Sequence, residues 1–285
     1  MLTLEELEKD WEETGRHGTE AQRLSHAEEW LPYYRYLAGR QDPNGFQLPE
    51  ERDGFLQTLA DRKLLLPGDT VLDIGAGMGS YTFDFAAMGC KVTALDVSPD
   101  CVELIRRKAA ACGADTVTPV LSPWEKFTPA EKFDVTFSSF CPAICNVAEL
   151  RRMESMTDRL CCLVAVMKGS YDLHRKRMMG ELSIVPHGGM TTEAIYYFNA
   201  LYLMGRRPNV MTRTIRSEYR IPAETILEQY SVYFEIFGIS RDRSLDYLRR
   251  YLDRYARDGF LTEKSVHHLA QIFWKPEGEE GGENP

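Results

Sequence analysis

A glycine-rich turn flanked by acidic residues is the stretch of this sequence best suited to chemistry. It reads VLDIGAGMGSY over residues 71–81 and contains Gly75, Gly77 and Gly79. Glycines at this spacing let the backbone turn sharply and let a ligand approach main-chain amides at the start of a helix. Asp96 ends the next apolar segment, where a carboxylate can accept hydrogen bonds from ribose hydroxyls. The pattern predicts a site for a ribose-containing cofactor.

The acid at position 73 helps to discriminate between two classes of cofactor. Dinucleotide sites use the pattern GxGxxG, and the place of its third glycine is taken here by Ser80. Asp73 comes shortly before the first glycine, so its carboxylate would repel a pyrophosphate. The same carboxylate would attract the amino and sulfonium groups of S-adenosylmethionine. We therefore expect S-adenosylmethionine as the cofactor, with a nicotinamide dinucleotide as the alternative.

Alternating apolar segments and helical patterns must position this turn. Strands alternating with helices predict a parallel sheet that is covered on both faces. We expect strands at 71–74, 91–98, 116–122, 133–140 and 159–169, and helices at about 79–88, 99–113 and 146–157. Further along we expect a helix at 192–204, an extended segment at 209–221, helices across 223–258 and a final strand at 267–275. Ligands bind at the carboxyl ends of the strands of such sheets.

The stretch VLDIGAGMGSYTFDFAAMGCKVTALDVSPDCVELIRRKA resembles the class I S-adenosylmethionine-dependent methyltransferases, with a specific match over about 66–140. The resemblance implies an α/β, Rossmann-like methyltransferase fold, with a seven-stranded, mostly parallel sheet whose last strand is antiparallel. It also implies roles in cofactor binding for four groups of residues. These are the loop residues Asp73, Gly75, Ala76, Gly77 and Gly79, the ribose-binding Asp96 with Val97, the adenine-contacting Ser122 and Trp124, and Ser139 near the end of the fourth strand.

The end of the fourth strand, FSSFCPAICN, is expected beside the transferable methyl group. Phe140, Cys141 and Pro142 are therefore candidate walls of a substrate pocket. If Cys141 caps a helical turn, its thiol would have a lowered pKa and could be reactive. Cys141 and Cys145 could each line the pocket, act as a reactive thiol or bind a metal. The Cys-x₃-Cys spacing is weak for zinc, so we predict no metal site. The stretch lacks an Asn-Pro-Pro-Tyr motif, so we do not expect methylation of DNA amino groups.

In-line methyl transfer requires alignment and exclusion of water, and it requires a general base only for a protonated nucleophile. A conspicuous base is therefore not expected. The weak candidates for catalysis are His26, Tyr34, Cys141, Tyr171 and His174, any of which could instead be a surface or core residue. Trp30 and Tyr33 share one expected helical face with Tyr34. That face predicts either core packing or a substrate-contacting lid.

Residues 168–220 carry nine basic and four acidic side chains in a chain of net charge −9. A solvated face explains such a segment, and so does attraction of an anionic substrate. The turn HGG at 187–189 is a candidate hinge for a lid.

Composition limits the functional classes. A hydrophobic content of 44% with a net negative charge is typical of a globular protein and does not favour general binding to nucleic acid or membranes. The seven cysteines are odd in number and include an adjacent pair at 161 and 162, which predicts free thiols in the cytoplasm. The acidic N-terminus is unlike a signal peptide, and no apolar run is long enough to span a bilayer.

We therefore expect a cytoplasmic S-adenosylmethionine-dependent methyltransferase that acts on a small metabolite, anionic if the basic segment contacts it. The expected organisation is a helical N-terminal extension or lid at 1–63, a methyltransferase domain at 64–275 with a helical insertion at about 171–262, and a disordered tail at 276–285. The alternatives are a nicotinamide-dependent oxidoreductase on a related sheet and a methyltransferase-like module that binds without turnover.

Overall fold

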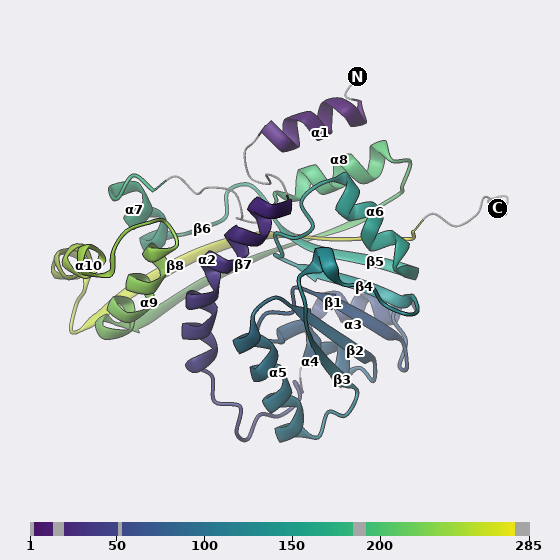
Figure 1. The fold of residues 1–285 in the computed structure, drawn as a ribbon. Helices are drawn as coiled ribbons and strands as arrows, with labels where there is room; N and C mark the ends of the chain where they lie inside the picture. The colour runs from purple at the N-terminus through teal and green to yellow at the C-terminus, as the bar shows by residue number, and fades with distance from the viewer. Residues whose placement is uncertain (1–2, 14–19, 51–52, 185–191, 277–285) are drawn as a thin grey trace.

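The computed structural model describes residues 3–13, 20–50, 53–184 and 192–276 (Figure 1). A single mixed sheet organises them, with strand order β3-β2-β1-β4-β5-β8 and further strands paired to β8. The first five strands run parallel, and β8 is antiparallel to β5. The strands are β1 (Thr70–Ile74), β2 (Lys91–Asp96), β3 (Val117–Leu121), β4 (Phe133–Ser139), β5 (Thr157–Val166), β6 (Tyr171–Asp172), β7 (Asn209–Pro222) and β8 (Phe260–Trp274).

Strand β8 is paired along both of its edges. Leu269 pairs with Val166 of β5 on one edge and with Arg213 of β7 on the other. The short strand β6 pairs with β8 just beyond β5, so it continues the β5 edge. Because both β5 and β7 are antiparallel to β8, β7 runs in the same direction as β5. The expected antiparallel last strand is confirmed, but it begins at Phe260 instead of residue 267, and the sheet has eight strands because β6 adds one.

Helices cover both faces of the sheet. One face packs against α3 (Gly54–Asp61), α4 (Ser80–Ala87) and α5 (Pro99–Cys112). The other packs against α1 (Leu4–Glu13), α6 (Val147–Ser155) and α8 (Ala194–Leu203). Sequence signals explain the bounds of α5: the Ser98 side chain caps its start, Pro99 takes the first turn, and Gly113 follows its end with φ +67°.

A third hydrophobic cluster forms a separate helical cap. It combines α7 (Leu173–Glu181), α9 (Ala223–Glu235) and α10 (Arg241–Tyr255) with the outer ends of β7 and β8. Figure 1 shows these helices gathered where β7 and β8 extend beyond the other strands. The helix α2 (Glu20–Gly39) contacts both α5 and α9, so it lies between the cap and the half of the sheet that contains β1 to β3. No helix in the described ranges is both long and apolar enough to cross a membrane.

Candidate functional site

The glycine-rich loop joins β1 to α4 with three left-handed residues. Gly75, Gly77 and Gly79 have φ values of +71°, +55° and +84°. A Cβ placed on Gly75 would lie 2.4 Å from Sγ of Cys141, so no larger residue fits there without rearrangement. A Cβ on Gly77 would meet nothing within 4 Å. The loop is therefore packed against the protein at Gly75 and open at Gly77, as a ligand cradle requires.

Asp96 stands at the end of β2 beside this open position. Its Oδ2 accepts a hydrogen bond from the Gly77 amide at 2.7 Å, and its Oδ1 accepts one from the Ser98 amide at 2.8 Å. A carboxylate has about four acceptor positions, so acceptor capacity remains for a ligand. Burial raises the pKa of Asp96, while the amides of Ser98, Gly77 and Val97 oppose that shift. The acid predicted to bind ribose thus lies against the loop predicted to hold the rest of the cofactor.

Hydrogen bonds connect the glycine-rich loop and the strand before it to β2 and α4. The amides of Gly75 and Ala76 both donate to the carbonyl of Leu95. Asp73 is 2% exposed and accepts a hydrogen bond from Oγ1 of Thr82 in α4 at 2.6 Å. Burial raises the pKa of Asp73 to about 7. Asp73 therefore ties β1 to α4 beneath the cradle, and its direct contact with a cofactor stays a prediction.

The segment after β4 contributes an exposed aromatic residue to the same edge. Phe140 directly follows Ser139 and has φ +51°, which is unusual for a residue with a side chain. Its amide donates to the carbonyl of Val164 at 3.0 Å, which holds the strained residue in place. The Phe140 side chain remains 41% exposed. Strained residues concentrate at functional sites, and this one stands at the carboxyl end of a central strand.

Cys141 packs directly against the glycine loop. Burial raises the pKa of the Cys141 thiol to about 12, and residues 141–145 form no helix. The hypothesis of a capping, reactive thiol with a lowered pKa is therefore wrong, because burial outweighs the favourable contacts. Cys145 is fully buried. In the residues that the structure describes, no cluster of three or more potential metal-ligating side chains exists.

Trp124, which was predicted to contact adenine, is a residue of the protein core. Trp124 is 4% exposed, its Nε1 donates to Oε2 of Glu149 at 2.6 Å, and the Arg152 guanidinium lies over its ring. The ring is a core group shared with α6 and offers no free face to a ligand. Ser122 does lie beside the cofactor edge, because its amide donates to the carbonyl of Asp96.

Helix α2 places three aromatic rings between the loop and the cap. Burial raises the pKa of Tyr34, and the nearby Asp96 and Cys141 add to the shift, so Tyr34 faces the cofactor edge. The Trp30 ring lies 5.9 Å from that of Tyr34 and 6.1 Å from that of Tyr33. These contacts make one continuous aromatic wall from the loop toward the cap.

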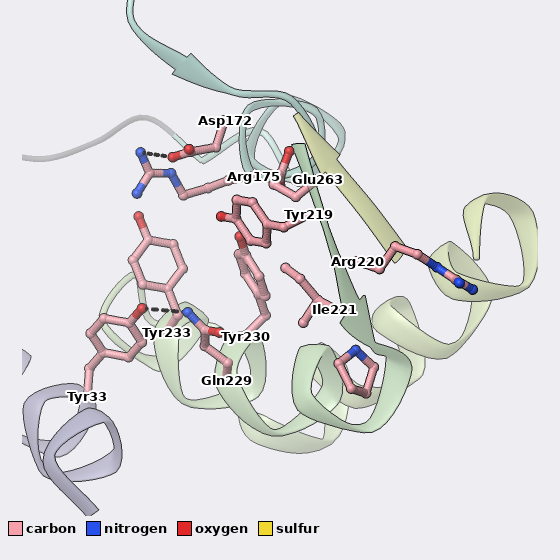
Figure 2. A pocket seen from close by; sticks show the side chains of 11 residues that line it. Tyr33, Asp172, Arg175, Tyr219, Arg220, Ile221, Gln229, Tyr230, Tyr233 and Glu263 are labelled. Atoms are coloured by element: carbon pink, nitrogen blue, oxygen red, sulfur yellow. Dashed lines mark hydrogen bonds and ion pairs between the residues drawn. The ribbon is translucent and has the colours of Figure 1, made fainter. Parts of the chain in front are cut away.

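The far side of that wall lines a cavity of about 450 Å³ (Figure 2). The cavity lies among α2, α7, α9 and the outer ends of β7 and β8. An arginine paired with an aspartate and a set of tyrosines are its main polar features. Its lining includes Tyr33, Asp172, Arg175, Tyr219, Tyr230, Tyr233 and Glu263. Tyr33 was a named candidate, and Asp172, Arg175 and Tyr219 belong to the basic segment 168–220 that was expected to attract an anionic substrate. Tyr230, Tyr233 and Glu263 were not expected, because they come from separate segments that meet only in the folded chain.

The remaining catalytic candidates are not found beside the glycine-rich loop in the described part of the chain. His174 is buried in the cap, where its Nδ1 is 2.7 Å from the hydroxyl of Tyr251, and burial lowers its pKa. It is a core histidine and not a base at the methyl-transfer edge. Tyr171 is exposed, with the Lys176 ammonium 5.8 Å from its ring centre. The side chain of His26 and the turn at 187–189 lie outside the described part of the chain.

The basic segment at 168–220 is distributed over several elements. Arg206 forms a buried ion pair with Glu154, and Arg213 contacts Asp53. Their acidic partners belong to α6 and to the start of α3, not to the cap. The segment is thus not a single independent basic face.

Comparison with known proteins agrees with the fold. Residues 71–161 match the family model described as a methyltransferase domain. The demethylmenaquinone methyltransferases of two Tropheryma whipplei strains are 26% identical to this chain over 144 residues, which are 50% of this chain and 56% of each relative. The chain therefore matches only about half the length of these curated relatives.

Two solved structures share the overall arrangement. A Bacillus halodurans protein provisionally named a methyltransferase is 14% identical, with a TM-score of 0.51 over 78% of this chain and 99% of its own. The YcgJ protein of Bacillus subtilis is 13% identical, with a TM-score of 0.51 over 79% of this chain and 99% of its own. At such identities the likeness establishes the Rossmann-like fold alone.

Proposed function

We infer that this chain, a member of the class I S-adenosylmethionine-dependent methyltransferases, transfers a methyl group from that cofactor to a small, anionic metabolite. One observation carries the proposal: the cradle at Gly77 is open to a ligand and faces a carboxylate, Asp96, that has acceptor positions to spare. The methyltransferase-domain match over 71–161 contains both residues.

The residues of the cradle fit this cofactor. S-adenosylmethionine, when bound, supplies an electrophilic methyl group on a sulfonium. Asp96 would accept hydrogen bonds from its ribose, and the loop around Gly77 would let it approach the main chain. Asp73 supplies negative potential beneath the loop once it is ionised, which favours a cationic ligand over a pyrophosphate.

The acceptor side favours a nucleophile that arrives unprotonated. Tyr34 and Cys141 are the described candidates nearest the loop, and both have raised pKa values. They therefore stay protonated near neutral pH and cannot serve as a base there. With Phe140 they can exclude water and hold the acceptor in line with the methyl group. The cavity beyond Trp30 gives the acceptor room, and its arginine supports an anionic substrate.

We also place the protein in a reducing compartment such as the cytoplasm. The support is that all seven cysteines are free thiols and five of them are buried, at 90, 101, 145, 161 and 162. Structural disulfides of the kind found in secreted proteins are not among them.

Calorimetry with S-adenosylmethionine tests the proposed function. We expect Asp96→Ala to bind the cofactor at least about tenfold more weakly, because hydrogen bonds to the ribose are lost. Glu103→Ala is the matched control, since Glu103 is an exposed acid of α5 paired only with the nearby Arg106 among the described residues. Wild-type protein that binds neither S-adenosylmethionine nor its demethylated product would overturn the proposal. An unchanged affinity in Asp96→Ala would show that the ribose binds elsewhere.

A further inference from the structure

We propose that Arg175 and the tyrosine hydroxyls around it bind a carboxylate of the methyl acceptor, so that the enzyme selects small carboxylic acids with a flat or apolar body. This inference rests on the proposed function and identifies its substrate class. It assigns a specificity-determining role to residues of the cap that lie outside the matched methyltransferase domain.

The cavity is placed where an acceptor would enter. Because β7 runs in the same direction as β5, its last residues lie at the carboxyl edge of the sheet, where ligands bind in such folds. Tyr219 and Ile221 of that end line the cavity. The Trp30 ring contacts Tyr233 inside the cavity and Tyr34 beside the cofactor loop, at 6.1 and 5.9 Å. One aromatic ring thus separates the two spaces.

Arg175 has hydrogen-bonding capacity to offer. In the described chain its one ion pair is to Oδ2 of Asp172, at 2.6 Å from Nη2. A guanidinium carries five N–H donors in a planar fork that matches a carboxylate. Asp172 is itself shared, because its Oδ1 also contacts Nε2 of His267 at 2.9 Å. Arg175 can therefore turn donors toward a ligand while it keeps its link to Asp172.

Tyrosine hydroxyls complete the anion subsite. Figure 2 shows the hydroxyls of Tyr219, Tyr230 and Tyr233 turned toward Arg175. Tyr230 lines the cavity and is only 8% exposed. Its hydroxyl can donate a hydrogen bond to a bound carboxylate, and the surrounding rings would shield that bond from water. Burial raises the pKa values of these three tyrosines, and the positive charge of Arg175 opposes that rise. The opposing effect is consistent with a short distance between the guanidinium and each hydroxyl.

The charges of the lining, two arginines and two acids, disfavour a ligand with two negative charges, since the guanidinium of Arg220 lies over the Phe260 ring. Asp172 already offsets Arg175, and the buried carboxylate of Glu263 lines the same cavity. A phosphate dianion would face both acids, whereas a carboxylate needs only the fork and the hydroxyls. A volume of about 450 Å³ is ordinary for a small-molecule site, and the tyrosine rings supply flat apolar walls.

Benzoate and benzamide are suitable probes, because they share a shape and differ in charge. We expect benzoate to bind the wild-type protein and benzamide to bind at least about tenfold more weakly, by ligand-observed NMR titration. Arg175→Met should abolish this preference, and Arg175→Lys should keep part of it, because a lysine retains the charge and lacks the planar fork. Lys176→Met is the control: it removes the same charge from the adjacent, exposed position of α7, and the preference should survive.

The benzoate preference separates a specificity role from a structural one. Equal binding of the two probes to wild type, or a preference retained in Arg175→Met, would overturn the proposal. Calorimetry with S-adenosylmethionine is run on the same variants. If Arg175→Met lost affinity for the cofactor by the same factor as for benzoate, the effect would be structural and the proposal would be overturned. Failure of wild type to bind the cofactor, with the benzoate preference intact, would instead refute the methyltransferase function alone.

Discussion

Gly75 and Gly77 share a backbone conformation but differ in what surrounds them. Alanine at either position must adopt a positive φ, which costs about 1–2 kcal/mol. At Gly75 the new methyl would also collide with Cys141, so we expect a total loss of about 2–4 kcal/mol in the free energy of unfolding. At Gly77 we expect the smaller loss alone, together with weaker cofactor binding, because the methyl group enters the open cradle. Urea denaturation and calorimetry measure the two effects.

A double mutant tests whether the collision is the cause. Combining Gly75→Ala with Cys141→Gly removes Sγ and Cβ of Cys141, the two atoms with which the new methyl would collide. The double mutant should then recover the part of the lost unfolding free energy that comes from the collision, and keep only the cost of the positive φ. The recovered part is the coupling energy between the two positions. Purely additive effects would mean that Cys141 does not define the space at Gly75.

These residues also show what a sequence can reveal about a site. The glycine loop and Asp96 could be predicted because their roles depend on local spacing along two strand ends. The contact of Cys141 with Gly75 could not, since it joins residues more than sixty positions apart. Trp124 misled for the same reason: its place after β3 is local, but its partner Glu149 comes from α6. The Arg175 cavity draws on segments from α2 to β8, and its sequence signal is limited to the excess of basic residues over 168–220.

At the level of elements, a buried carboxyl group links β1 to α4. The pKa of Asp73 is about 7, against about 3.9 in an unfolded chain. Between these values the folded protein holds a proton that the unfolded chain has released. This group's contribution to stability is therefore fully present below about pH 4 and is lost as the pH rises through 7.

Replacing Asp73 with asparagine should remove this pH dependence. Without cofactor, the wild-type protein should lose of the order of 2–4 kcal/mol relative to Asp73→Asn between about pH 4 and pH 8. Urea unfolding at a series of pH values measures the difference. Thr82→Val serves as a control, because it removes the hydrogen bond that favours the ionised form and should steepen the loss. Parallel pH profiles for wild type and Asp73→Asn would contradict the assignment.

The strand pattern was predictable where strands are continuous and apolar, and less so at the sheet's outer edge. β7 pairs with β8 over its full length, but the outer half of β8 is rich in charged and polar residues. It therefore gave no buried-strand signal, and the expected strand began late, at residue 267. β6 has two residues, which is too short for any periodicity to appear.

Across the whole molecule, α2 connects two parts that the sheet holds apart. Its Arg35 contacts Asp100 at the start of α5, and its Arg40 contacts Glu228 in α9. Both are exposed ion pairs, which contribute little to stability. The aromatic contacts of Trp30 with Tyr33, Tyr34 and Tyr233 are partly buried and therefore carry more of the attachment.

Trp30→Ala should therefore loosen the cap before it loosens the sheet. We expect a loss of roughly 1–3 kcal/mol in the stability of the α2–α9 contact, since the side chain is only partly buried. In hydrogen exchange, amides of α9 should exchange at least about fivefold faster, while those of β1 and β4 keep the protection of the global core. Tyr33→Phe removes only the hydrogen bond from Gln229 and should change exchange far less. If Trp30→Ala instead accelerated hydrogen exchange equally in α9, β1 and β4, the cap and the sheet would open as one cooperative unit. That result would contradict an independent opening of the cap.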